Sequence, residues 1–354
     1  MTAFLTPNTT CEPGDPAVGA ITRQSRRGPL QLCCALLVGL AACSSPYNFS
    51  REVGAFGTGV AQLSDGFNSG YAALAADRAA LAQLQLTGNR AKVAIAKSCF
   101  AIPGQSSQNE VPCELYRSGG SPPAPSEIEQ ARNKTTVLLV ALKDYAQALL
   151  AVTNAADRAA YDAAVGQLAS AVGAIASNAG PQGAAIGTVA PAAVNLTGWV
   201  VGAALDQQRF DSLKAGVDAV GRPLPDGKTI AIDAVAREAG AGLFALALAH
   251  REVLVNELTT LTHSLGPSLT DAAYRQRLND AQAIAAVLDR LRLTDPTATA
   301  NALIDAHRAL VAAVDDPGRD YSSLVTAVND FADQAAALHA ALSATPTAKS
   351  TTGR

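Results

Sequence analysis

The spacing of apolar residues between positions 53 and 84 constrains the fold more than any other feature of the sequence. Apolar residues recur there every three or four positions, which places them on one side of an α-helix. The only polar member of this stripe is Asp77. The other members are Val53, Phe56, Val60, Leu63, Phe67, Gly70, Leu74, Leu81 and Leu84. The pattern predicts one long helix whose first turns fray or break, because Gly54, Gly57 and Gly59 weaken them.

A second stripe with the same spacing follows a proline-rich segment at residues 118–125. Ser126 and Glu129 have the spacing of a capping box, which predicts a helix start at this point. The stripe contains Leu138, Leu142, Tyr145, Leu149, Val152, Val165, Leu168, Val172 and Ile175. If both helices are continuous, each has about 50 residues and is about 75 Å long. Joined by one loop, they would form an elongated antiparallel hairpin.

Turn signals divide the rest of the chain into shorter helices. Turns are expected at residues 178–183, 223–227, 266–267 and 315–320, where proline and glycine gather. Ser268 or Thr270 would cap one helix, and Asp295 followed by Pro296 would open the next. The last helix has a stripe made of Leu324, Val328, Phe331, Ala335, Leu338 and Leu342.

Composition supports an all-α class. Hydrophobic residues make up 49% of the chain and aromatic residues only 5%, so the core consists mainly of small residues and leucine. No run alternates apolar and polar residues long enough to predict a sheet. We therefore expect an elongated helical bundle that contains a long antiparallel helical hairpin plus several shorter helices. The formal charge of −3 gives no basic surface for nucleic acid.

The N-terminal segment has the layout of an export signal. An apolar run at residues 30–42 follows three arginines and is shorter than the roughly 20 residues that a membrane-spanning helix needs. It ends in Leu40, Ala41, Ala42 and Cys43, which resembles the lipobox of bacterial lipoproteins. The resemblance implies that residues 1–42 are removed and that Cys43 is acylated on its sulfur as the new N-terminus. The lipid would then hold the protein to a membrane.

Some details of export stay open. A buried N-terminal helix is the alternative to a signal peptide, and a translation start near Val18 would shorten the segment. Residues 25–31 partly resemble a twin-arginine signal, so the general and twin-arginine routes are both open. In a Gram-negative cell, Ser44 would favour the outer membrane, facing the periplasm. The expected organisation is a signal at residues 1–42, a tether at 43–50, a bundle at 51–344 and a disordered tail at 345–354.

Two of the six cysteines remain after removal of the signal and acylation of Cys43. Cys99 and Cys113 bracket a polar segment without helical periodicity, at one end of the expected hairpin. A disulfide between them would stabilise the protein by about 3 kcal/mol in the chain-entropy model. Such a bridge suits an exported protein, and two free thiols or half of a metal site are the alternatives. The clamped loop at residues 99–125 is the expected contact surface for a partner.

Residues 163–205 contain no charged side chain and no histidine. Small residues four apart, which let helices approach closely, occur at Gly183 and Gly187 and at Gly198 and Gly202, and Trp199 is the only tryptophan. One interpretation is a membrane-inserting hairpin, which resembles in outline the apolar hairpin of α-helical pore-forming toxins. The favoured interpretation is a helix pair enclosed by neighbours, packed with the apolar residues 239–250.

No pattern in the sequence predicts catalysis, a metal site or a cofactor. The four histidines lack metal-ligand spacing, although His250 and His307 would line one pocket if their helices were neighbours. Asp315, Asp316 and Asp320 suggest helix caps more than a cation site. We expect a non-catalytic envelope lipoprotein with a structural or binding role, with an envelope protein or a second copy as partner. A membrane-active bundle is the alternative, and an enzyme or small-ligand binder is a weaker one.

Overall fold

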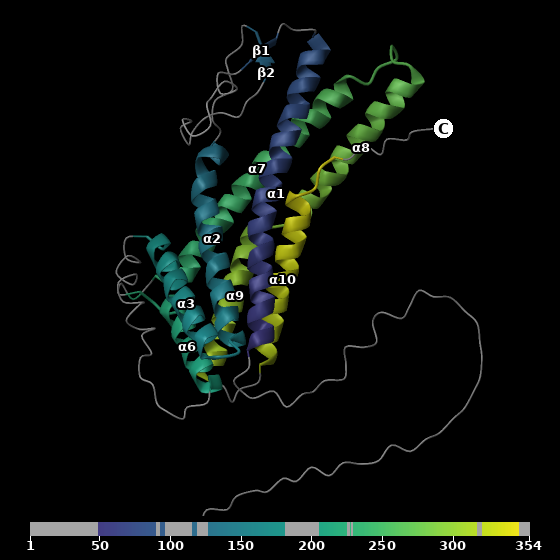
Figure 1. Cartoon of the computed structure of the whole chain (residues 1–354). Helices are drawn as coiled ribbons and strands as arrows, with labels where there is room; N and C mark the ends of the chain where they lie inside the picture. Colours follow the sequence, from purple (N-terminus) through teal and green to yellow (C-terminus); the bar gives the residue numbers. More distant parts are fainter. Residues whose placement is uncertain are drawn as a thin grey trace, which may run out of the picture. The chain divides into compact units, whose positions relative to one another are not determined.

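The computed structural model describes residues 49–89, 93–95, 115–118, 127–180, 205–224, 227, 229–316 and 321–346. The chain divides by its internal contacts into two units, Met1–Ser44 and Ser45–Arg354. All described residues belong to the second unit, where they form a bundle of α-helices (Figure 1). The predicted all-α class is confirmed.

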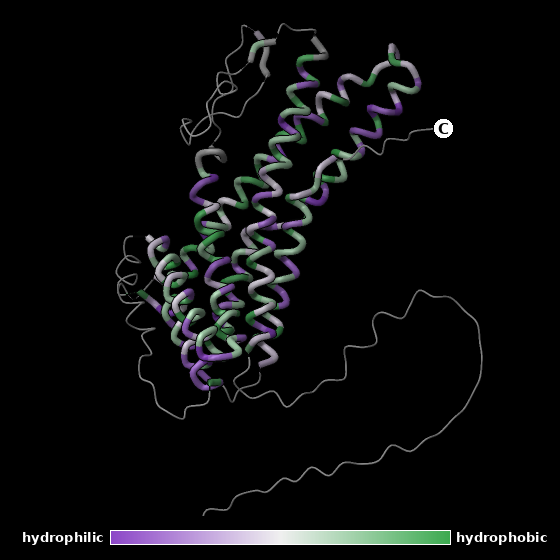
Figure 2. The backbone as a smooth tube through the Cα atoms, in the orientation of Figure 1, coloured by the Kyte–Doolittle hydropathy of each residue, from purple (hydrophilic) through white to green (hydrophobic). Residues whose placement is uncertain are grey.

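The helices follow the chain in a simple order. Their bounds are α1 Ser50–Asn89, α2 Glu127–Asn154, α3 Arg158–Asn178, α6 Leu205–Gly221, α7 Ala231–His263, α8 Asp271–Leu293, α9 Pro296–Asp315 and α10 Ser322–Leu342. Two short strands, β1 Val93–Ile95 and β2 Leu115–Arg117, lie between α1 and α2. Apolar and polar residues alternate in short groups along each helix, as a one-sided apolar stripe requires (Figure 2).

Helix α1 is about 60 Å long and packs against α2, α7 and α10. The predicted stripe forms its buried side, where Val53, Phe56, Val60, Leu63, Phe67 and Leu74 are each at most 3% exposed. Helix α2 runs antiparallel to α1, because Asn154 meets Ser50 at one end and Arg132 stacks on Tyr71 farther along. The predicted antiparallel hairpin is therefore present.

The glycines near the start of α1 do not break the helix, contrary to the sequence-based expectation. α1 is continuous from Ser50, and the residue before it, Phe49, is buried against Phe210 and Tyr321. A Cβ atom on Gly59 would lie 2.6 Å from the ring of Phe331, and one on Gly66 would lie 3.0 Å from Cα of His339. These glycines thus permit α10 to approach α1 closely, which compensates for their low helix propensity.

The second long helix is shorter than predicted, because residues 155–157 are not helical and separate α2 from α3. Asp157 caps α3 by accepting a 2.8 Å hydrogen bond from the backbone N–H of Ala160. Arg209 on α6 donates a hydrogen bond to the carbonyl of Ala155, which lies in the break. α3 packs against α2 as a separate helix, and the continuous 50-residue helix is therefore not formed.

Several helix ends occur where the sequence indicates. Thr270 accepts a 3.3 Å hydrogen bond from the N–H of Ala273 at the start of α8. Asp295 accepts a 2.8 Å hydrogen bond from the N–H of Thr297, and Pro296 occupies the first position of α9. The predicted stripe of α10 is buried throughout. Ser126 of the expected capping box lies outside the described residues.

Strands β1 and β2 pair antiparallel, with Ile95 opposite Leu115 and Val93 opposite Arg117. No strand was expected here, because three residues are too few to give a recognisable alternation. The pairing brings together the two ends of the segment that contains Cys99 and Cys113. Both cysteines lie outside the described residues, so their disulfide stays a prediction.

Most of the described part of residues 163–205 belongs to α3, which buries one side and exposes the other, and Leu205 begins α6. Leu168, Val172 and Ile175 face the bundle, whereas Ala163 and Gln167 face outward. This first arm is therefore not enclosed on all sides by described residues. Among the described helices, only residues 131–154 are long and apolar enough to cross a bilayer, and more than half of their most apolar window is buried in the bundle.

Candidate functional site

The site residues named from the sequence lie outside the described residues. They are Cys43, Cys99, Cys113, Gly183, Gly187, Gly198, Trp199 and Gly202. Their roles in lipidation, disulfide formation and helix packing stay predictions. Among the described residues, buried polar side chains mark the candidate site, because burying a polar group without a hydrogen-bond partner is energetically costly.

One buried polar pair joins α1 and α7. Nε2 of His250 donates a hydrogen bond to Oδ2 of Asp77 across 2.6 Å. The histidine is fully buried and Asp77 is only 5% exposed. Nδ1 of His250 is also buried and has no hydrogen-bond partner among the described residues. Asp77 is thus the one polar residue of the α1 stripe because it partners the histidine of an otherwise apolar stretch of α7.

A second buried pair joins α2 and α9. The hydroxyl of Tyr145 and Nε2 of His307 are 2.9 Å apart, and the ring of Phe56 on α1 lies beside the imidazole. Burial lowers the pKa of His307 to about 3 and raises the pKa of Tyr145 well above its usual range. Both groups are therefore neutral at physiological pH, and the pair holds helices together without charge.

The two histidines do not line one pocket, contrary to the hypothesis drawn from the sequence. His307 lies beside Phe56, whereas His250 binds Asp77, and these two α1 residues are separated by about 30 Å along the helix. Each histidine also has its own polar partner. An arginine follows each of these histidines in the sequence, and this shared pattern therefore reflects two separate packing sites.

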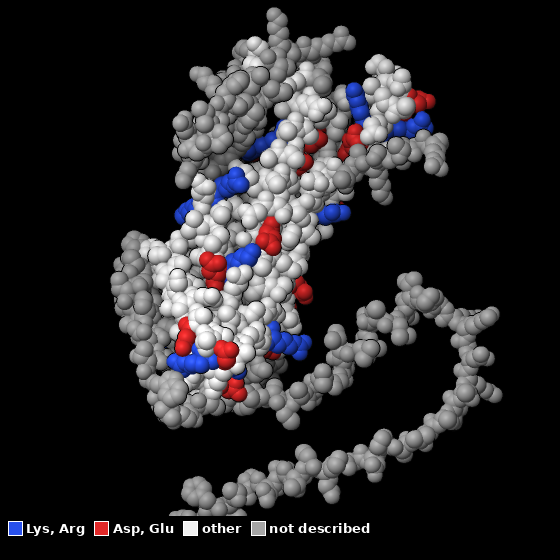
Figure 3. Space-filling view, in the orientation of Figure 1, with Lys and Arg blue, Asp and Glu red and all other residues white. Residues whose placement is uncertain are grey.

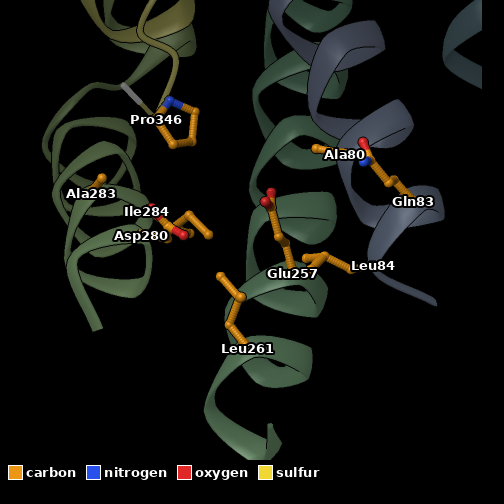
Figure 4. Close-up of a pocket in the computed structure, with 9 residues that line it drawn as sticks. All are labelled: Ala80, Gln83, Leu84, Glu257, Leu261, Asp280, Ala283, Ile284 and Pro346. Carbon is orange, nitrogen blue, oxygen red and sulfur yellow. The ribbon is translucent and has the colours of Figure 1, made fainter. Parts of the chain in front are cut away.

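A pocket of about 270 Å³ opens between α1, α7 and α8, near the end of the described chain. Figure 4 shows the carboxylate of Glu257 on α7 in the middle of the pocket. Ile284 and Asp280 on α8 lie on one side of it, and the side chains of α1 lie on the other. The other lining residues are Ala80, Gln83, Leu84, Leu261, Ala283 and Pro346. Among the described residues, no lysine or arginine lines the pocket.

Glu257 is the unusual group in this pocket. The residue is only 8% exposed, and its Oε2 atom is buried without a hydrogen-bond partner among the described residues. Burial, together with the nearby carboxylates of Asp77 and Asp280, raises the pKa of Glu257 to about 7. Glu257 follows His250 by two helical turns on the buried side of α7, so one stripe carries both groups.

The raised pKa of Glu257 predicts a stability that falls as pH rises. Between pH 4.5 and about 7, the folded chain keeps a proton that the unfolded chain has lost. Above pH 7 the buried carboxylate is ionised, which destabilises the folded chain by on the order of 2 kcal/mol, or roughly 4–8 °C in Tm. Replacing Glu257 by glutamine removes this destabilisation. Thermal unfolding of Glu257→Gln should therefore give a higher Tm than wild type at pH 8.

At pH 4.5 the Glu257→Gln variant and wild type should have nearly the same Tm, because the carboxyl of Glu257 is then protonated in the folded chain. Glu252→Gln changes an exposed carboxylate on the same helix and is the matched control, with little change in Tm at either pH. Equal Tm values for Glu257→Gln and wild type at pH 8 would contradict the buried, protonated state of Glu257.

Several other charged side chains form ion pairs on the surface or at helix contacts. Asp315 pairs with Lys214 and Arg222, which lowers the pKa of this carboxyl, and Asp233 binds Arg308 at 2.6 Å. Positive and negative groups are scattered over the face drawn in Figure 3, and neither sign gathers in one large patch. The described residues contain no cluster of three metal-ligating side chains, and Asp320 lies outside them.

Glu257 and the partner of His250 were not predicted from the sequence. A signal for both was available in the apolar stripe of α7, where His250, Leu254, Glu257 and Leu261 follow helical spacing. A polar residue in a buried stripe requires a partner, and Asp77 in the α1 stripe is the matching residue for His250. The pocket itself had no sequence signal, because it depends on how α8 packs.

Comparison with protein families, with curated proteins and with solved structures found no match. The function therefore has to be argued from the residues of this chain and from the geometry of the bundle.

Proposed function

We propose that this protein is a bacterial envelope lipoprotein that acts as a non-catalytic structural or binding component. In this proposal, residues 1–42 are a removed export signal, and acylated Cys43 anchors the helical bundle to a membrane. The outer membrane, facing the periplasm, is the proposed location. The partner is an envelope protein or a second copy of the chain.

The observation that carries the proposal is the sequence that ends at Cys43. Three arginines precede an apolar run at residues 30–42, which ends in Leu40, Ala41, Ala42 and Cys43. A basic segment, a short apolar run and small residues follow one another in export signals. The small residues directly before the cysteine resemble the lipobox of bacterial lipoproteins, which supports acylation of Cys43.

The short distance along the chain between anchor and bundle would limit where the bundle can stand. Six residues separate Cys43 from the N-terminus of α1 at Ser50, and at 3.3–3.6 Å per residue this link spans at most about 25 Å. The end of the bundle with Phe49 would thus stay near the membrane. Because α1 is about 60 Å long, its other end, with β1 and β2, would be free to meet a partner.

The proposal predicts that Cys43→Ala abolishes acylation and the membrane attachment that depends on it. In a bacterial host, wild type should be recovered in the detergent phase after phase partitioning, because several acyl chains anchor it firmly. The Cys43→Ala variant should keep its signal segment and lose the acyl modification. Cys34→Ala alters a cysteine in the removed segment and should behave as wild type. Acylation of Cys43→Ala, or loss of attachment in both variants, would contradict the proposal.

A further inference from the structure

We propose that the pocket around Glu257 binds a small organic cation, with a primary ammonium group on an apolar body. This inference goes beyond the proposed envelope role and does not depend on the lipid anchor. It rests on the shape of the pocket, on the sign of its charge and on one buried carboxylate oxygen that has no partner.

The charge of the pocket favours a cation. Oε2 of Glu257 is buried in the pocket without a donor among the described residues. A second carboxylate, from Asp280, lines the same pocket and accepts one hydrogen bond of 2.9 Å from Gln276. Asp77 on α1 is a third carboxylate close enough to act on Glu257, and it is hydrogen-bonded to His250. An ammonium group has three donors, and the carboxylates of Glu257 and Asp280 can accept hydrogen bonds from it.

The walls of the pocket favour an organic cation over a metal ion. Ala80, Leu84, Leu261, Ala283, Ile284 and Pro346 supply an apolar lining. Contact with these apolar side chains stabilises a bound hydrocarbon group, but the side chains offer no ligand to a metal ion. Calcium needs six to eight oxygen ligands, whereas this pocket offers two carboxylates and one amide. A pocket of about 270 Å³ suits a ligand of the size of a small amine.

Protonation of Glu257 should compete with the cation. Because its pKa is about 7, roughly a tenth of the carboxyl is ionised at pH 6 and most of it at pH 8. Binding through this carboxylate should therefore weaken about tenfold from pH 8 to pH 6. Among the described residues, the titratable groups that act on Glu257 are Asp77 on α1 and Asp280 on α8, and Asp77 is itself hydrogen-bonded to His250.

The test uses benzylammonium as the probe and the full chain purified in detergent. Isothermal titration calorimetry at pH 8 should show saturable binding that weakens about tenfold at pH 6. Glu257→Gln should weaken binding at least tenfold at pH 8, and Glu252→Gln should leave it unchanged. Ala80→Trp, which fills the pocket from α1 and keeps the carboxylate, should also prevent binding.

Four results can overturn the inference. Benzyl alcohol has the same ring without the charge, and binding as strong as that of benzylammonium would remove the role of the carboxylates. Tighter binding of calcium or magnesium ions in the same pocket would assign it to a metal. Unchanged affinity in Glu257→Gln, or no heat from benzylammonium at any pH, would also overturn it.

Discussion

Replacing Gly59 and Gly66 together by alanine is expected to destabilise the bundle by about 2–4 kcal/mol. Both glycines lie on the side of α1 that faces α10, one heptad apart. Added Cβ atoms would lie 2.6 Å from the ring of Phe331 and 3.0 Å from Cα of His339. Phe331 is fully buried and the second contact is with backbone, so α10 has to move away as a whole. Overpacking of this kind costs about 1–3 kcal/mol per site.

The matched control is Gly57→Ala, two residues from Gly59 on the same helix. A Cβ atom on Gly57 would be 3.9 Å from Ala146, which is ordinary van der Waals contact. This change should stabilise the protein by up to about 1 kcal/mol, because alanine favours helix more than glycine does. Thermal or urea unfolding measures both variants. Equal and small effects at the two sites would show that α10 does not pack closely on α1.

Breaking the pair between Asp77 and His250 is expected to cost about 3–5 kcal/mol. Replacing His250 by leucine leaves a buried carboxylate without its donor, and replacing Asp77 by leucine leaves a buried imidazole without its acceptor. The cost of an uncompensated buried charge is of this size. Each single variant should therefore unfold at a clearly lower urea concentration than wild type.

The double variant, Asp77→Leu with His250→Leu, should recover much of this loss, because an apolar pair leaves no buried group unsatisfied. A double-mutant cycle would then give a coupling free energy well above 1 kcal/mol. The same cycle for Asp65 and Lys143, an exposed pair 3.5 Å apart on α1 and α2, should give less than about 1 kcal/mol. Additive losses at Asp77 and His250 would contradict direct contact.

Local signals in the sequence were enough to place much of the fold. The stripes of α1 and α10 were predicted residue by residue, because a helix with one buried side repeats its apolar residues every three or four positions. The starts of α8 and α9 were predicted from Thr270 and from Asp295 with Pro296, since a cap involves residues that are close in sequence.

Features that depend on contacts between distant segments were not predictable in the same way. The break between α2 and α3 is stabilised by Arg209, more than fifty positions away, as well as by the local cap at Asp157. The glycines of α1 were judged by helix propensity, whereas their role depends on Phe331 and His339. Propensity is a weak guide where tertiary packing decides.

The candidate site was less predictable than the fold. Asp77 and His250 were noticed separately, but their pairing requires that α1 and α7 lie side by side, which no local pattern shows. Glu257 was missed, because a carboxylate in a helix is ordinary until its neighbours are known. The pocket arises only when α8 packs near α1 and α7.

The intact mass of the wild-type protein, purified from a bacterial host, tests the central claim most directly. The lipid-anchor proposal predicts a chain that begins at Cys43 and carries the added mass of acyl groups. A chain that retains residues 30–42, without added mass, would contradict it. In that case these residues would belong to the folded protein, and the membrane location and the argument for a disulfide between Cys99 and Cys113 would be withdrawn.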